Sequence, residues 1–486
     1  MTFADVMTTV GDWLSLIIFA YAVLVCVLLI YDNREPATTL SWIVVLLLLP
    51  VVGLVLYFFL GRNWRRTATR YPEYKKAWDR SRQLLDPLYE RYTATAERVE
   101  REYGPTHLGG VVKLIEKTNR FSPLPAQDVD YYDNGGEFFD AVLHEISRAE
   151  KYVHLQYFIW EYDELTRRFK DALLERLRAG VEVRIMYDLI GSLPYSKSEL
   201  KELAAAGAKV MPERQGLGVL NYRDHLKIMI MDGRVGFTGG FNLGQEYISG
   251  KPHYESWRDT GIRLDGPAVI QLQAIFGLHW TVAGGDEILN ETYFADPGLN
   301  NEAGAVPCQF VSSSFMSPWP AIKLAYEEVI NAASESAWIQ SPYFVPDESL
   351  HSAIVSSSLT DIDLRFMMTG VADKKLAWDA AHSYYVPVLK AGGRIFQYMP
   401  GFFHAKTISI DHKLCAIGTF NVDTRSLLLH DELMCFIYDE EFTRTLEASF
   451  ERDQADCLEV TEQYMASLGK WRTFKGSAGR LLAKLL

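Results

Sequence analysis

Two long apolar runs stand near the N-terminus of the chain. Residues 13–30 contain no charged side chain, and residues 40–60 form a second uncharged run. The hydrocarbon core of a bilayer is about 30 Å thick and needs roughly 20 apolar helical residues to cross it. A short polar turn with a proline, residues 31–36, separates the runs. The pattern predicts a hairpin of two transmembrane helices within residues 1–62.

The basic residues near this hairpin are distributed unevenly. They cluster directly after the second run, at Arg62, Arg65, Arg66, Arg70, Lys75 and Lys76. The connecting turn holds only Arg34, and no Lys or Arg precedes the first run. This bias predicts that both termini lie in the cytoplasm. A signal peptide fits poorly, because the basic start and the small-residue cleavage site are missing and a second run follows. A buried hairpin of a soluble protein is the other alternative.

The remainder of the chain has a different pattern. Residues 63–107 are charged and rich in helix formers, which predicts a helical connector. After it, short β-rich runs alternate with amphipathic stretches: a strand within 152–160, a helix at 165–179 and a strand at 181–187. Strands that alternate with helices predict an α/β fold, with a sheet flanked by helices.

One segment of this α/β region occurs twice. Both copies have the spacing H-x-K-x4-D-x6-G-[GT]-x-N. The first copy consists of His225, Lys227, Asp232 and Asn242, and the second of His404, Lys406, Asp411 and Asn421. The flanking segments 152–158 and 337–344 are also similar. We therefore predict two similar lobes, at about 108–296 and 297–468, related by a pseudo-twofold axis.

Composition narrows the function classes. The net charge of -13 argues against general nucleic-acid binding, which usually needs a basic surface to neutralise phosphates. The five cysteines are scattered, odd in number and never arranged as C-x-x-C. This usage predicts neither a disulfide framework nor a zinc site, and it fits a reducing cytoplasmic setting for the catalytic part.

The paired motif predicts a single site for a phosphodiester. In a strand, residues i and i+2 share a face, so the histidine and lysine of each copy emerge side by side. The glycines before each asparagine allow close approach of the backbone. One neutral imidazole can then attack phosphorus while the other, protonated, donates to the leaving oxygen. The lysines and asparagines stabilise the phosphate oxygens. This chemistry requires no metal or cofactor.

Four carboxylates complete the candidate site. Asp259 follows His225 by 34 residues and Glu432 follows His404 by 28. We predict that these two orient the histidines, because an attacking imidazole needs an acceptor at its second nitrogen to fix the tautomer. Asp232 and Asp411 belong to the motif and stand among the candidate catalytic residues. For them we favour a structural role, as turn residues or as ion-pair partners that hold the halves together.

The paired motifs resemble those of the phospholipase D superfamily at every signature position. The resemblance implies a two-lobed α/β/α fold and a phosphohistidine mechanism without a metal. It also implies that the histidine of the first motif is usually the nucleophile. This role falls on His225 and the acid–base role on His404, although the sequence itself is equally consistent with the reverse.

The rest of the chain is similar to one branch of that superfamily, the bacterial cardiolipin synthases. The similarity includes the anchor residues Arg34, Pro36, Trp42, Pro50, Gly53, Tyr57 and Gly61 and the segments 257–260, 341–346 and 421–426. His430 departs from the pattern, in which an asparagine is expected. The resemblance implies that two phosphatidylglycerol molecules are joined into cardiolipin and glycerol. It also implies a location in the bacterial inner membrane, with the catalytic part in the cytoplasm.

Three alternatives remain beside this interpretation. A phospholipase D hydrolase, or a transferase with another alcohol acceptor, would use the same motif, which handles only the phosphatidyl half of the reaction. A membrane-tethered nuclease is disfavoured by the acidic charge, and a catalytically inactive scaffold by two intact motifs. The tail, 469–486, is basic and amphipathic. It is expected either to lie on an anionic membrane surface or to be a frayed tail or a helix packed on the domain. The aromatic stretches 315–319 and 402–403 are candidates for lipid contact or core packing.

Overall fold

The computed structural model describes residues 3–31, 36–61, 71–213, 221–251, 254 and 256–481. The chain divides into two compact units. The first comprises Met1–Thr69 with Gln215–Asn221, and the second comprises Arg70–Arg214 with Tyr222–Leu486. The second unit contains both copies of the repeated motif and is called the catalytic unit below.

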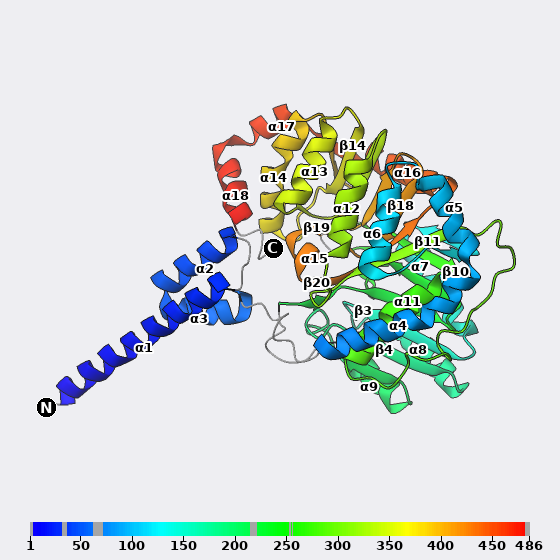
Figure 1. The fold of residues 1–486 in the computed structure, drawn as a ribbon, viewed down its shortest axis with the longest axis horizontal. Coiled ribbons are helices and arrows are strands. Elements are labelled where there is room, and N and C mark those ends of the chain that lie inside the picture. The colour runs from blue at the N-terminus through cyan, green and yellow to red at the C-terminus, as the bar shows by residue number, and fades with distance from the viewer. Residues whose placement is uncertain are drawn as a thin grey trace. The chain divides into compact units, whose positions relative to one another are not determined.

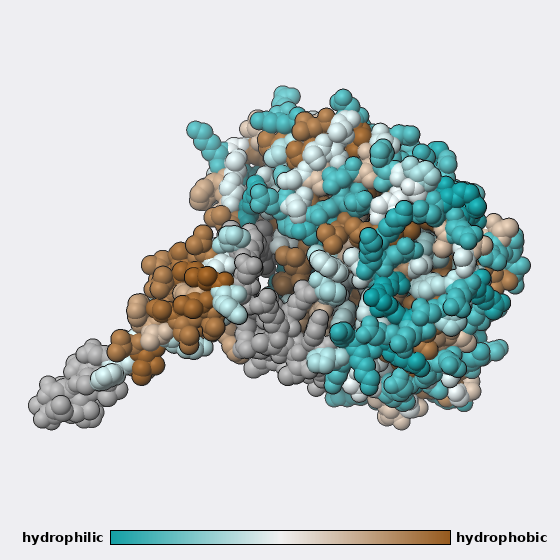
Figure 2. Space-filling model, in the orientation of Figure 1, coloured by the Kyte–Doolittle hydropathy of each residue, from teal (hydrophilic) through white to brown (hydrophobic). Residues whose placement is uncertain are grey.

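The first unit is helical. Its elements are α1 (Phe3–Tyr31), α2 (Pro36–Leu48), α3 (Pro50–Leu56) and a π-helical turn, η1 (Tyr57–Gly61). Val25, Cys26 and Leu29 of α1 pack against Leu46 of α2. Most of the other large apolar side chains described on these helices are exposed, so Figure 2 shows hydrophobic residues over this unit. Such a surface suits lipid better than water.

Within the described residues, one helical segment is long and apolar enough to cross a membrane, Trp13–Tyr31. The prediction of a second spanning helix at 40–60 is not confirmed, because the run is divided at Leu49. The backbone of Leu49 has φ -132° and ψ 65°, and Pro50 begins α3. A proline disfavours the helical conformation of the residue before it, which explains the break. The turn 32–35 and the basic segment 62–70 lie outside the described residues.

The first lobe of the catalytic unit contains a seven-stranded sheet in the order β2-β10-β8-β7-β3-β4-β5. The strands are β2 (Asp128–Tyr132), β3 (Tyr152–Tyr157), β4 (Glu182–Tyr187), β5 (Lys209–Pro212), β7 (Lys227–Met231), β8 (Val235–Gly239) and β10 (Gly261–Asp265). The helices are α7 (Gly135–Arg148), α8 (Glu164–Arg178), α9 (Ser198–Ala205), α10 (Glu246–Ser249) and α11 (Val269–Val282). Strands β3, β4 and β5 are parallel, and the other neighbours pair antiparallel.

The second lobe repeats this order strand by strand as β11-β20-β18-β17-β12-β14-β15. These strands are β11 (Val306–Ser313), β12 (Ser336–Gln340), β14 (Asp363–Thr369), β15 (Arg394–Tyr398), β17 (Thr407–Ile410), β18 (Leu414–Gly418) and β20 (His430–Ile437). Its helices are α12 (Ala321–Ala332), α13 (Glu348–Ser358), α14 (Lys375–Lys390), α15 (Thr424–Leu428) and α16 (Glu440–Ala455). The expected α/β fold with two similar lobes is confirmed (Figure 1).

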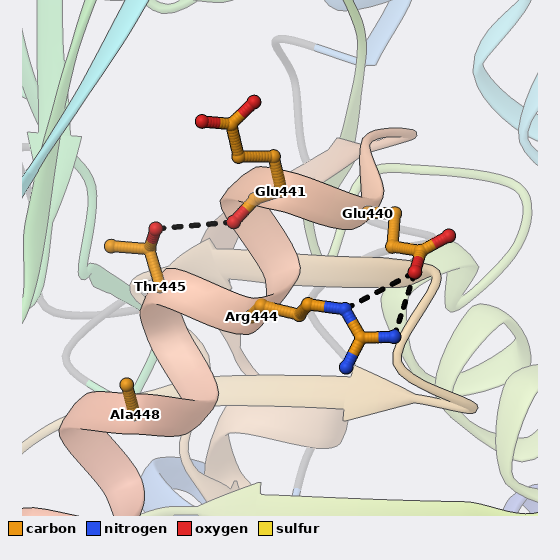
Figure 3. A pocket seen from close by; sticks show the side chains of 5 residues that line it. All are labelled: Glu440, Glu441, Arg444, Thr445 and Ala448. Carbon is orange, nitrogen blue, oxygen red and sulfur yellow. Dashed lines mark hydrogen bonds and ion pairs between the residues drawn. The ribbon is translucent and has the colours of Figure 1, made fainter.

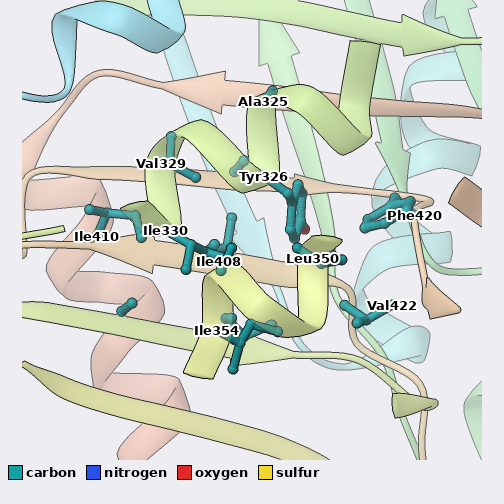
Figure 4. Close-up of a cluster of buried hydrophobic side chains, with 14 of the residues drawn as sticks. Ala325, Tyr326, Val329, Ile330, Leu350, Ile354, Ile408, Ile410, Phe420 and Val422 are labelled. Carbon is teal, nitrogen blue, oxygen red and sulfur yellow. The ribbon is translucent and has the colours of Figure 1, made fainter. Parts of the chain in front are cut away.

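The core of each lobe lies between its sheet and its helices. In the second lobe, Tyr326 and Val329 of α12 and Ile354 of α13 meet Ile408 and Ile410 of β17 (Figure 4). All five side chains are almost fully buried. Burial of each large apolar side chain contributes on the order of 1.5–3 kcal/mol. The motif strand β17 is therefore held rigidly by the layer of helices behind it.

Residues expected to form a connector are packed on the lobes. Helix α4 (Tyr71–Arg91) lies against α11 of the first lobe (Figure 1). The following helices, α5 (Thr93–Tyr103) and α6 (Gly109–Asn119), join the second lobe, since Val111 and Ile115 of α6 enter the same core as α12. Strand β1 (Leu124–Ala126) then pairs with β11. Residues 108–126, expected in the first lobe, thus lie on the edge of the second.

The C-terminal helices α17 (Glu462–Ser467) and α18 (Gly469–Leu481) follow the edge strand β21 (Cys457–Val460). Helix α18 packs on α14, where a side chain on Gly476 would lie 2.8 Å from the Asp379 carbonyl oxygen. The guanidinium of Arg472 lies over the Trp378 ring. The packed-helix alternative for the tail is therefore realised over 469–481, while Trp471 and Phe474 stay exposed.

Candidate active site

Two short pairs of strands join the lobes at the motifs. In one pair, β6 (Arg223–Asp224) lies parallel to the start of β20, with Asp224 opposite Asp431. In the other, β16 (Phe402–Phe403) lies parallel to β9 (Trp257–Arg258), with Phe403 opposite Arg258. The residue after each pair is a motif histidine on one chain segment and a predicted orienting carboxylate on the other. The two junctions are thus pseudo-symmetric.

The histidines and carboxylates form crossed hydrogen bonds. His225 Nδ1 lies 3.0 Å from Glu432 Oε2, and His404 Nδ1 lies 2.6 Å from Asp259 Oδ2. The main chain follows the same pattern, because His225 N donates to the Asp431 carbonyl oxygen at 3.0 Å. Each histidine is therefore held by a carboxylate of the opposite lobe. The sequence spacing indicated the carboxylates but not this exchange between lobes.

The environment favours neutral imidazoles in the free protein. Burial lowers the pKa of His404 to about 4, and Lys406 adds to the effect. Burial, followed by the charge of Lys227, also holds the pKa of His225 well below its usual range. When the carboxylates are ionised and accept at Nδ1, each ring carries its proton on that nitrogen and the lone pair on Nε2 is available. A neutral imidazole with this tautomer is suited to nucleophilic attack.

The motif lysines are fully buried. Lys227 Nζ donates to the His225 carbonyl oxygen at 2.8 Å, and Lys406 Nζ donates to that of His404. Burial lowers the pKa of Lys227 to about 7 and that of Lys406 to about 8. Strand β7 begins at Lys227 and β17 at Thr407, so each histidine lies just before its strand. The contact between each histidine and its lysine is made by the histidine's backbone carbonyl oxygen. A bound anion would offset the positive charges of both lysines.

The motif asparagines are not equivalent. Asn242 donates from Nδ2 to the Tyr247 hydroxyl at 2.6 Å, and its Oδ1 accepts from the Ile159 N–H at 3.3 Å. Asn421 is buried, and its Oδ1 accepts no hydrogen bond from the part of the chain that the structure describes. Donation by both amides to a bound phosphate stays a prediction.

Asp232 and Asp411 lie at the far ends of β7 and β17 from the histidines. The carboxylate of Asp232 accepts the backbone N–H groups of Glu150, Lys151 and Tyr152, each at 2.8 Å. Asp411 does the same for residues 334–336. Both have positive φ, 56° and 52°, as turn residues do. Each aspartate thus caps a strand of its own lobe, which supports the turn role favoured for both residues, and their place among the catalytic residues stays a prediction.

Several ring contacts of the histidines were not predicted from the sequence. The Phe158 ring lies 4.9 Å from the His225 ring, and Trp257 lies 5.9 Å from His404. His430, noted only as a departure, lies with its ring 5.8 Å from that of His225. Tyr247 lies 6.1 Å from His404. Their sequence signal is position: Trp257 and His430 each precede an orienting carboxylate by two residues.

One cluster behind β20 has the composition of a metal site. The ligand atoms of Glu213, His279 and Asp431 lie within 4.8 Å of one another, and all three residues are buried. Burial, then the charge of Glu213, raises the pKa of the neighbouring Asp224 to about 8. Protonation of Asp224 thus relieves the crowding of carboxylates. No motif histidine belongs to this set, which is the group among the described residues that could hold a cation.

A shallow hollow on α16 lies away from this chemistry. Figure 3 shows its lining residues, Glu440, Glu441, Arg444, Thr445 and Ala448. Arg444 pairs with Glu440 at 2.7 Å, one helical turn away. Such exposed pairs contribute little free energy. The hollow contains neither a motif residue nor an orienting carboxylate.

The chain matches a family model described as "Cardiolipin synthase, PLD-like domain" in two segments, residues 142–280 and 326–454. These segments fall on the two lobes. Residues 17–62 match a second model, "Phospholipase_D-nuclease N-terminal".

Curated relatives extend over nearly the whole chain. "Cardiolipin synthase" of Geobacillus kaustophilus is 33% identical and covers 97% of this chain and 93% of its own length. "Major cardiolipin synthase ClsA" of Bacillus subtilis is 34% identical, covering 97% of this chain and 98% of itself. Among solved structures, phosphatidylserine synthase of Haemophilus influenzae shares the fold, with a TM-score of 0.56 at 13% identity over 77% of this chain and 100% of its own. The protein therefore belongs to the cardiolipin synthase family of phospholipase D-like enzymes.

Proposed function

We propose that this phosphatidyltransferase joins two phosphatidylglycerol molecules into cardiolipin and free glycerol. The observation that supports this most is the pair of crossed histidine–carboxylate hydrogen bonds beside two buried lysines. Two imidazoles and two ammonium groups around one centre fit a single phosphodiester, with one histidine as the apical nucleophile and the other beside the opposite apical oxygen. Membership in the family supports the lipid substrate.

In the first step, His225 Nε2 attacks phosphorus of the donor lipid. The bond from phosphorus to the glycerol headgroup oxygen breaks, and protonated His404 gives its proton to that oxygen. Asp259 stabilises the imidazolium of His404 across their hydrogen bond. The bound phosphodiester anion also favours that proton, because it offsets the lysine charges that lower the pKa of His404 in the free protein. The product is a phosphatidyl-histidine.

In the second step, the hydroxyl of another phosphatidylglycerol attacks the phosphatidyl-histidine. His404 Nε2 takes the hydroxyl proton, the phosphorus–nitrogen bond breaks, and cardiolipin leaves. Lys227 and Lys406 stabilise the non-bridging oxygens in both steps. The reverse assignment of the two histidines would use the same groups, since the geometry is pseudo-symmetric.

A lipid acceptor prevails over water when it is present at high local concentration. The apolar helix α1 would supply this by holding the enzyme in the bilayer that contains its substrates. We infer two crossings near 13–30 and 40–60, with the catalytic unit in the cytoplasm at the bacterial inner membrane. The first unit would then meet lipid on its exposed apolar faces. In this assignment no nucleic acid is a substrate.

Product analysis tests the proposal. Detergent-solubilised protein is mixed with phosphatidylglycerol in the presence of a chelator, and the lipids are resolved by mass spectrometry. Cardiolipin with an equal amount of glycerol, absent in a His225→Ala variant, is the expected result. Phosphatidic acid as the main product would replace the proposal with a hydrolase. Cleavage of RNA or plasmid by the wild-type protein alone would replace it with a nuclease.

A further inference from the structure

The two orienting carboxylates differ in how their oxygens are paired. Both oxygens of Asp259 accept hydrogen bonds, Oδ2 from the His404 ring at 2.6 Å and Oδ1 from a backbone N–H at 2.8 Å. In Glu432, Oε2 accepts twice, from His225 Nδ1 at 3.0 Å and from the Thr419 hydroxyl at 2.5 Å. Its Oε1 accepts no hydrogen bond from the described residues, although the side chain is fully buried. A buried carboxylate oxygen without a donor is costly, so a donor is expected beside Oε1.

The ring of His430 faces this oxygen. His430 Nδ1 lies 3.7 Å from Glu432 Oε1, somewhat farther than a hydrogen bond reaches. Nδ1 is itself buried and forms no hydrogen bond within the described ranges of the chain. The same ring lies 5.8 Å from the ring of His225. A nitrogen and an oxygen that both lack a partner therefore face each other beside the histidine that attacks phosphorus.

Arg425 determines which nitrogen of His430 carries the proton. Arg425 Nε donates to His430 Nε2 at 3.3 Å. A guanidinium can only donate, so Nε2 must accept, and a neutral ring then carries its proton on Nδ1. Burial, followed by the charge of Arg425, holds the pKa of His430 well below its usual range, which keeps the ring neutral. The geometry thus directs an N–H donor at the unpaired oxygen of Glu432.

His225 needs Glu432 in its ionised form. An ionised carboxylate accepts from Nδ1 and leaves the lone pair on Nε2, whereas a protonated one would donate to Nδ1 and move the ring proton to Nε2. Burial raises the pKa of Glu432 well above its ordinary range, and the charge of Lys227 and the hydroxyls of Thr419 and Ser426 oppose this shift. A further donor at Oε1 would favour the ionised form in the same way.

We propose that His430 is a positioning residue for the nucleophile: its Nδ1–H donates to Glu432 Oε1 during catalysis, and Glu432 then holds His225 with its Nε2 lone pair toward phosphorus. The inference rests on the proposed function. The 3.7 Å separation in the free protein has to shorten to about 2.8 Å, and catalytic hydrogen bonds commonly tighten when substrate binds. Trp257 stands at the equivalent position of the other junction, where Asp259 already has a backbone donor.

Three substitutions of His430 in the full-length protein test the role. In His430→Asn, the amide nitrogen is as many bonds from the backbone as Nδ1, so it can still donate to Glu432. In His430→Gln, the amide stands at the place of Nε2, so a partner for Arg425 is kept and the donor to Glu432 is lost. His430→Leu removes both contacts. For cardiolipin formation, kcat should fall about 10- to 100-fold in the glutamine and leucine variants, the loss expected for a hydrogen bond to a charged group. It should stay within about threefold of wild type in His430→Asn, and KM should be nearly constant throughout.

Single-turnover formation of phosphatidyl-His225 separates positioning from loss of structure. Damage to the fold would lower the amount of labelled enzyme, whereas loss of positioning lowers the rate constant and leaves the final amount unchanged. We expect the second result for His430→Gln and His430→Leu. His144→Leu removes an exposed histidine of α7 and should change neither quantity.

The possible failures are distinguishable. Cardiolipin formation by His225→Ala would end the proposed function itself. With that function intact, a rate constant for His430→Gln within threefold of wild type would overturn the positioning role. A loss in His430→Asn as large as that in His430→Gln would overturn it as well.

Discussion

Replacement of Asp259 by asparagine removes the charge that faces His404 from the other lobe. In the wild type, Asp259 Oδ2 accepts from His404 Nδ1 at 2.6 Å, while Oδ1 accepts from the Thr260 N–H at 2.8 Å. An asparagine can keep the second bond with its carbonyl oxygen. Its amide then faces His404 as a donor, which favours a proton on Nε2 and removes the lone pair that the acid–base step needs.

The expected loss follows from these two bonds. A hydrogen bond to a charged group contributes about 1.5–3 kcal/mol, which corresponds to roughly a 10- to 150-fold change in rate. The wrong tautomer adds to that loss, so we expect kcat for cardiolipin formation to fall about 100-fold or more. The Thr260 bond is retained, and the melting temperature should therefore stay within a few degrees of wild type, roughly the shift for a change below 1 kcal/mol.

The assay is the initial rate of cardiolipin formation in mixed micelles at saturating phosphatidylglycerol and pH 7. Asp232→Asn serves as the matched control. It loses acceptor capacity for the three N–H groups at the start of β3, so it should lower the melting temperature but leave kcat of the folded protein unchanged. A kcat for Asp259→Asn within threefold of wild type, in a stably folded protein, would refute the orienting role.

Three other perturbations test separate parts of the account. Because the pKa of Lys227 is lowered to about 7 and that of Lys406 to about 8, both lysines lose their charge as pH rises, so the KM for phosphatidylglycerol should increase between pH 7 and 9. A KM that stays constant over that range would contradict phosphate binding by the two lysines. Gly240→Ala would place a methyl group 1.9 Å from Asp259 Oδ1, so kcat should fall about as far as in the Asp259 variant, whereas an unchanged kcat would show that the carboxylate can move freely. If the exposed face of α18 contacts lipid, replacing both Trp471 and Phe474 by serine should raise the mole fraction of phosphatidylglycerol needed for half-maximal rate in vesicles without changing kcat. An unchanged mole fraction would leave α18 with a packing role alone.

The sequence predicted the features that depend on local pattern and on the repeat. Alternating strands and helices indicated the α/β fold, and two copies of one motif indicated two lobes with a shared site. Residue spacing also pointed to Asp259 and Glu432. It did not reveal that each faces a histidine of the other lobe, since this depends on the two-residue strands β6, β9 and β16. Strands so short have no recognisable hydrophobic period.

One difference is local: an uninterrupted apolar run predicted one helix at 40–60, but Pro50 divides it because of its effect on Leu49. Other differences arise where tertiary packing decides. Helix α6 and strand β1 precede the first lobe in sequence and yet bury their apolar side chains on the second. Propensity and periodicity describe neighbours along the chain, and these contacts are between distant segments.

The central claim is that a motif histidine carries the phosphatidyl group between two lipids. It is tested most directly by incubating the protein with phosphatidylglycerol labelled at phosphorus, quenching in alkali, where phosphohistidine survives, and mapping the labelled peptide. We predict label on His225 that is absent in His225→Ala and is released as cardiolipin when unlabelled phosphatidylglycerol is added. Steady formation of cardiolipin with label on neither His225 nor His404 would contradict the account.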